Sequence, residues 1–197
     1  MAKIGMLYPK YSVITIGTDS SSGAETETYG DLKVMGKAVR ASVTINAAEA
    51  KLYADDGLAE MVKEFVEGSI SAETDDMEDS VAADLYGATM TQADGGTAGK
   101  IVYKDTDSSA YLRFGFIVRR MKANKVQYKA IVYTKVMFDI PNEDYETKGE
   151  TIVFKTNSVT GKLMRNKDRI WKITSLWVDT IDAAETFLDA NVKPLTA

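Results

Sequence analysis

The stretch LRFGFIVRRMKANKVQYKAIVYTKVMF, from Leu112 to Phe138, decides the fold. In its first half, every second side chain is apolar: Leu112, Phe114, Phe116 and Val118 share one face. Alternation resumes from Val126 to Phe138, after the short connection Lys122-Ala-Asn-Lys125. A period of two is typical of half-buried strands, and an Asn-containing connection between two such segments is typical of a β-hairpin. The sequence therefore predicts two long antiparallel strands here.

The same period occurs on both sides of this hairpin. In Arg40–Ala47, apolar residues alternate with Arg40, Ser42, Thr44 and Asn46. In Val66–Asp76, Val66, Ile70 and Ala72 alternate with polar residues. Both segments are predicted to be strands with one core face and one solvated face. Further strands are expected at Tyr11–Ile16, Thr151–Thr156 and Ile170–Val178.

Two segments have helical patterns. Met77–Tyr86 follows Asp75 and Asp76, which fit an N-cap with acids in the first turn, and precedes Gly87, which fits a C-cap. Its apolar stripe consists of Met77, Val81, Leu85 and Tyr86. Asp182–Leu188 is a second, shorter candidate, with Ala183, Phe187 and Leu188 expected to point inward.

Strands outnumber helices, and hairpins are more evident than crossover units. The expected class is β-rich α+β: an antiparallel β-sandwich or partial barrel with one flanking α-helix and extended loops and arms. The length suits a single domain over residues 1–197. Three polar stretches are expected to be loops that contact a partner, because long structureless loops are uncommon in compact domains: Gly17–Gly30, Thr89–Lys100 and Asn142–Gly149.

The composition narrows the possible chemistry. The 197 residues include no cysteine and no histidine, which excludes disulfides, Cys/His zinc sites and catalytic triads that need either residue. No run approaches the roughly 20 apolar residues of a spanning helix, and Pro9 interrupts the only N-terminal candidate for a signal peptide. We therefore expect the product in the cytoplasm, without membrane insertion.

Candidate ligand motifs are incomplete. Asp94–Ile101 resembles a phosphate-binding loop, but Asp94 replaces the first Gly and Ile101 replaces Ser or Thr. Asp105–Ser109 resembles the start of a calcium loop, but Phe116 stands where Glu is needed. The acids Asp75, Asp76, Glu78 and Asp79 fit a helix N-terminus as well as a cation site. We expect no cofactor, no metal and no enzyme, with a carboxylate-dependent hydrolase as one alternative.

Charge is unevenly distributed. Residues 1–99 hold 7 basic and 17 acidic side chains, whereas residues 100–197 hold 17 basic and 12 acidic ones. The segment from Ser108 to Phe138 has seven basic side chains and no acid. Nucleic-acid binding by this hairpin is disfavoured, because Phe114 and Phe116 belong to the core face and the whole chain is acidic. The asymmetry instead favours two complementary surfaces on one molecule.

Several stretches, in their order, resemble the major tail proteins of long-tailed bacteriophages, in particular the phi13-type family. The stretches are Lys3–Tyr8, Gly36-Lys-Ala38, Lys51–Asp56, Ser69–Met77 with Leu85-Tyr-Gly87, and Thr147–Phe154 with Thr160-Gly161. The resemblance covers most of the chain at similar spacing. Each motif is weak alone, and their order carries the resemblance.

The resemblance implies a fold and a role. Such proteins are β-sandwich subunits, similar to type VI secretion tube proteins, whose hexameric rings stack head-to-tail into a hollow tail tube. The implied function is that of a structural virion protein whose tube conducts the genome during ejection. The implied partners are other copies of the chain, DNA and the tape-measure protein in the lumen, and tail terminator and distal tail proteins. The alternative is an adhesion or pilus-like β-sandwich module.

Two groups of residues are the candidates for these contacts. Short polar and acidic side chains suit a lumen through which DNA slides, because each phosphate neutralised by Lys or Arg strengthens binding. The lumen-face candidates are Ser42, Thr44, Asn46, Glu67, Ser69, Ser71 and Glu73. The inter-subunit candidates are Arg119, Arg120, Lys122 and Lys125, which are expected at the tip of the basic hairpin.

Overall fold

The computed structural model describes residues 3–54, 57–94, 98–140 and 156–194. The strands are β1 (Lys3–Thr18), β2 (Glu25–Tyr29), β3 (Lys33–Val34), β4 (Ala38–Ala54), β5 (Gly57–Thr74), β6 (Thr89–Thr91), β7 (Lys100–Val102), β8 (Tyr111–Lys122), β9 (Lys125–Phe138), β10 (Asn157–Met164) and β11 (Lys172–Thr174). The helices are α1 (Asp79–Tyr86) and α2 (Ile181–Val192). The prediction of a β-rich α+β fold is confirmed.

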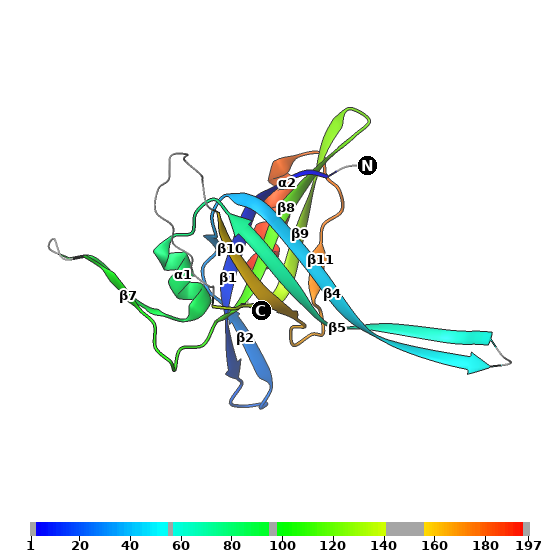
Figure 1. Ribbon diagram of the computed structural model, residues 1–197, viewed down its shortest axis with the longest axis horizontal. Coiled ribbons are helices and arrows are strands. Elements are labelled where there is room, and N and C mark those ends of the chain that lie inside the picture. Colours follow the sequence, from blue (N-terminus) through cyan, green and yellow to red (C-terminus); the bar gives the residue numbers. More distant parts are fainter. Residues whose placement is uncertain (1–2, 55–56, 95–97, 141–155, 195–197) are drawn as a thin grey trace, which may run out of the picture.

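One antiparallel sheet of nine strands forms the body (Figure 1). Its order is β2-β1-β8-β9-β10-β5-β4, with β3 also paired to β1 and β11 to β9. The strands β6 and β7 form a separate two-stranded ribbon. The sheet curls until β4 faces β1, β8 and β9, although β1 and β4 are not hydrogen-bonded to each other. The result is a partial barrel with an open seam between these two strands.

The hairpin β8–β9 lies at the centre of the sheet, as the sequence predicts. Ala123 and Asn124 form its two-residue turn, and both have positive φ, 49° and 58°. This left-handed pair matches the twist of the flanking strands. Phe114 and Phe138 pack edge to face in the main core, with ring centroids 5.8 Å apart. The opposite face is also buried, because Ile117 packs against α2.

Most of the prediction for helix α1, namely its apolar stripe and its C-cap, is confirmed. Val81, Leu85 and Tyr86 are buried, and Gly87 adopts the left-handed conformation (φ 70°) of a C-cap. The predicted N-cap is wrong, however: the helix begins at Asp79, two residues later. Asp75 does not cap α1, because its carboxylate accepts a hydrogen bond from the backbone N–H of Lys37 at 2.8 Å. This bond instead joins the end of β5 to the start of β4.

Helix α2 is longer than the predicted segment and covers the sheet at β8 and β9, so the expectation of a single flanking helix is wrong. Its buried side chains are Ala184, Leu188 and Val192. Ala183 is exposed rather than inward. Lys10 of β1 forms ion pairs with the helix: its ammonium group lies 2.7 Å from carboxylate oxygens of both Glu185 and Asp189.

The predictions of polar loops and late strands need correction. Gly17–Gly30 contains the end of β1 and all of β2, and Thr89–Lys100 contains β6. The turn between β1 and β2 is closed by Asp19, whose carboxylate accepts hydrogen bonds from Ser21 and Ser22. These bonds, led by the Ser21 hydroxyl, lower the pKa of Asp19 to about 2.

In the last third of the chain, the predicted loop Asn142–Gly149 and all but the last residue of Thr151–Thr156 lie outside the described residues. Thr156 itself is not in a strand; β10 begins at Asn157. Within Ile170–Val178, only β11 and a single bridge between Val178 and Tyr128 are extended.

Candidate assembly surfaces

A two-stranded arm is the most prominent feature outside the body. Strands β4 and β5 continue well beyond the sheet, pointing away from both helices (Figure 1). We define the arm as residues 47–54 and 57–65. It begins at a β-bulge, where Asn46 pairs with Glu67 but Ala47 pairs with Phe65. The sequence predicts extended arms, but the strands predicted here stop at this bulge, so the position of the arm was not predicted.

The inner face of the arm is mixed: an internally paired cluster of charges lies beside Ala47, Met61 and Phe65. In the body, Ala41, Val43 and Ile45 of β4 line the inside of the partial barrel. Beyond the bulge, the same side of β4 carries Glu49 and Lys51. Glu49 forms ion pairs of 2.6 Å with Lys51 and 2.8 Å with Lys63, and these hydrogen bonds lower its pKa.

The outer face of the arm carries exposed aliphatic side chains together with two glutamates. Leu52 lies opposite Glu60, Ala50 opposite Val62, and Ala48 opposite Glu64. Leu52 is 58% exposed and Val62 is 54% exposed, and Ala48 and Ala50 are exposed too. On this side, β4 carries Ser42, Thr44 and Asn46 before the bulge. The apolar side of the strand therefore changes at the bulge, and this reversal is the sequence signal that could have revealed the arm.

The arm has little stabilisation of its own. Isolated two-stranded ribbons are at best marginally stable in water, because they lack a third strand or a packed face. The arm adds a stripe of exposed aliphatic side chains to that deficit, and such stripes mark interaction sites. The chemistry of the outer face therefore fits contact with another macromolecule.

The seven lumen-face candidates lie together on the outside of β4 and β5. Ser42 pairs with Ser71, Thr44 with Ser69, and Asn46 with Glu67, while Glu73 lies opposite Arg40. Strand β10 extends the surface with Ser158, Thr160 and Lys162. We call this surface the hydroxyl face. Val66, expected in the core, is 53% exposed, because it is the extra residue of the bulge.

The four inter-subunit candidates lie at or near the tip of the β8–β9 hairpin. Lys122 and Lys125 flank the turn opposite each other and are exposed. Arg120 is different, because its guanidinium group lies 3.9 Å from the centre of the Trp177 ring and donates two hydrogen bonds to Gln127. Arg119 is half-buried. The structure brings the four basic residues together but engages Arg120 within its own chain.

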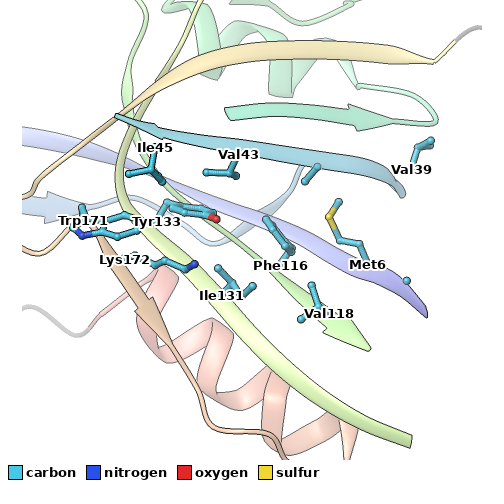
Figure 2. Close-up of a pocket in the computed structure, with 12 residues that line it drawn as sticks. Met6, Val39, Val43, Ile45, Phe116, Val118, Ile131, Tyr133, Trp171 and Lys172 are labelled. Atoms are coloured by element: carbon cyan, nitrogen blue, oxygen red, sulfur yellow. The ribbon is translucent and has the colours of Figure 1, made fainter. Parts of the chain in front are cut away.

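A cavity of about 500 Å³ lies inside the partial barrel (Figure 2). It is lined mostly by apolar side chains, together with Tyr133 and Lys172: Met6, Val39, Ala41, Val43, Ile45, Phe116, Val118, Ile131 and Trp171. Burial raises the pKa of Tyr133 to about 12, so this lining residue is neutral at physiological pH. The Lys172 ammonium group lies 5.7 Å from the ring centres of both Tyr133 and Trp171. Val39 and Ile45 are exposed at the lip.

Where the structure describes them, the phosphate-loop-like and calcium-loop-like segments form no ligand-binding site. Asp107 closes a turn, accepting a hydrogen bond from the Lys104 backbone N–H at 2.8 Å. Part of the segment Asp94–Ile101 lies outside the described residues. Within the described ranges, no group of three acidic side chains is placed to hold a metal ion.

Neither helix in the described part of the chain is long and apolar enough to span a membrane. The sequence matches no protein-family model and no curated protein.

Proposed function

We propose that this chain is a structural subunit that polymerises, as stacked hexameric rings, into the hollow tail tube of a long-tailed phage. The observation that carries the proposal is the arm. It projects from the body, presents Leu52 and Val62 to solvent, and satisfies its charges on the opposite face.

An arm at one end of a subunit favours open polymers. A contact between two different patches is heterologous, and repeating it without closure generates a filament. The edge strands β2 and β4 add unpaired backbone groups on each side of the sheet. Pairing edges between neighbours removes them and closes a ring. Rings and stacks thus use different surfaces of the same subunit.

The hydroxyl face supports the lumen assignment. Its short Ser, Thr and Asn side chains offer hydrogen bonds without charge, and Glu67 and Glu73, which repel phosphate, balance Arg40 and Lys162 on the same face. A surface of this kind lets DNA slide, because few phosphates are neutralised. In the proposed tube, this face contacts DNA and the tape-measure protein. The role proposed for the chain is structural rather than catalytic.

Electron microscopy of the purified chain tests this proposal. We expect hollow tubes or rings with a central channel, and light scattering that rises with protein concentration. An adhesion or pilus-like module would instead give monomers or solid fibres. A strict monomer at high concentration and varied salt would contradict the proposal.

A pair of variants links assembly to the arm. Val62→Asp puts a charge on the outer face and should leave a folded subunit that assembles poorly. Val34→Asp is the matched control, because Val34 is 53% exposed but lies on β3, away from the arm. Equal assembly of the two variants would show that the arm takes no part.

A further inference from the structure

We infer that the base of the arm is a hinge, and that the stacking of Phe65 on Trp171 is the latch that sets the direction of the arm. The inference concerns the free subunit, so it does not require a partner bound to the arm. Its bearing on assembly rests on the proposed function, which needs every subunit to present its arm in the same direction.

The sheet loses its continuity at the base of the arm. Strand β10 supports β5 only as far as Gly68, which pairs with Leu163. Just beyond that pair, Val66 is the extra residue of the bulge, and the ladder between β4 and β5 is interrupted there. Farther out, the arm consists of β4 and β5 alone (Figure 1). Because a bulge leaves a residue unpaired and bends its strand, the junction has the build of a hinge.

An aromatic contact spans this junction. Phe65, the arm residue next to the bulge, has its ring parallel to that of Trp171, with an interplanar angle of 1° and ring centroids 4.7 Å apart. Both side chains are half-buried and pack against the main core. An aromatic pair adds stability beyond the area that it buries. The stack therefore favours one direction of the arm over the others.

Trp171 is fixed to the centre of the sheet. Its backbone carbonyl accepts a hydrogen bond from the backbone N–H of Thr134 at 3.2 Å, and the next residue, Lys172, pairs with Tyr133. Both partners belong to β9, the central strand in the order of the sheet. The stack thus couples the arm to the middle of the body, across the interrupted ladder.

Distance measurements within one chain test the latch. The chain has no cysteine, so Ala50→Cys on the arm and Val34→Cys on β3 place two spin labels at exposed positions. In dilute solution, double electron–electron resonance should give one narrow distance distribution for this labelled subunit. Phe65→Leu keeps an apolar side chain but removes the stack, so the distribution should become about twofold wider. Phe65→Tyr retains the ring and should restore the narrow distribution.

Matched variants separate the stack from a general loss of packing. Phe187 of α2 is also a half-buried phenylalanine, but it packs against the apolar cluster between α2 and the sheet. Phe187→Leu should leave the distance distribution unchanged, whereas Trp171→Leu should broaden it as Phe65→Leu does. Equal widths for wild type and Phe65→Leu, at the same circular dichroism, would overturn the inference. Equal broadening by Phe187→Leu would overturn it too.

The outcomes separate this inference from the proposed function. Wild-type tubes, together with an unchanged width in the Phe65→Leu subunit, would refute the latch and leave the tube proposal standing. A distribution that broadens in Phe65→Leu, in a chain whose wild type never associates, would refute the tube and leave the latch standing.

Discussion

At the scale of single residues, the turn between β8 and β9 stores removable strain. Ala123 has φ 49°, a conformation that costs a non-glycine residue about 1 kcal/mol. Ala123→Gly should raise the free energy of unfolding by about 0.5–1 kcal/mol, after the added entropy of the unfolded chain is subtracted. Urea titration measures this change. The control Ala190→Gly, in α2, should lower it by about 1 kcal/mol instead.

Lys10 stabilises the fold through its ion pairs with α2, and this contribution can be measured separately from packing. Burial alone would lower its pKa, but its hydrogen bonds to Asp189 and Glu185 outweigh burial and raise the pKa above 10.5. Its stabilising effect is therefore complete below about pH 10 and is lost as the pH rises through the raised pKa. Lys10→Met should cost about 1–2 kcal/mol at pH 7, because both carboxylates are about one-third exposed.

The pH dependence distinguishes this ion pair from general packing. Urea midpoints from pH 7 to pH 11 should converge for wild type and Lys10→Met, because only wild type has the Lys10 charge to lose. A constant difference between the two proteins across this range would mean that the methylene stem of Lys10, rather than its charge, fastens α2.

At the scale of elements, the arm is where local stability and assembly meet. Backbone amides of residues 47–52 lie in a ribbon without a third strand, so they should exchange hydrogen quickly in the free subunit. They should become protected on assembly by at least tenfold. Amides of Val132 and Val136, at the centre of the sheet, should be slow in both states. Unchanged exchange in the arm would mean that it stays solvated in the polymer.

The same scale shows what the sequence could predict. The β8–β9 hairpin and the buried stripe of α1 follow from a uniform periodicity of apolar residues, which a single sequence is enough to show. The arm does not, because the apolar side of β4 reverses after Ala47, and a single-phase pattern ends there. The strand β2 was read as loop because its Glu and Thr side chains are polar, although pairing with β1 keeps it extended.

The surfaces were predicted unevenly for a related reason. Strand alternation is enough to place the seven lumen-face candidates on one face, and they do share one face of β4 and β5. The cavity depends on how far the sheet curls, which brings β4 opposite β8. Sequence distance and periodicity carry no measure of that curvature. Arg120 was expected at a free tip because nothing in the sequence places Trp177 beside it.

At the scale of the whole molecule, the lumen assignment predicts a difference in access. Ser71→Cys should react with a maleimide carried on a large polymer in the free subunit but at least tenfold more slowly in tubes. The reason is that a narrow channel excludes the polymer while small reagents still enter. A small maleimide is the control and should label both states. Equal labelling by the large reagent would place the hydroxyl face outside the tube.

Charge complementarity between copies is a further prediction of the proposed assembly. The basic residues of the β8–β9 tip have no acid among them in sequence, whereas residues 1–99 have a net charge of −10. Because Arg120 is held by Trp177 and Gln127, the useful triple reversal is Arg119, Lys122 and Lys125 to Glu. Single exposed pairs contribute about 0–1 kcal/mol, but every subunit repeats the contact, so the triple variant should assemble poorly while its circular dichroism stays unchanged.

Salt should act in the same direction as the triple reversal. Screening at 1 M salt limits charge interactions to about 3 Å, so wild-type tubes should form less readily there than at 0.1 M. The apolar contact of the arm should respond oppositely to sulfate, which strengthens burial. Measuring tube yield in chloride and in sulfate therefore separates the two contacts. Normal tubes from the triple variant, combined with no loss in 1 M chloride, would leave the apolar arm as the dominant contact and make the charge asymmetry incidental to assembly.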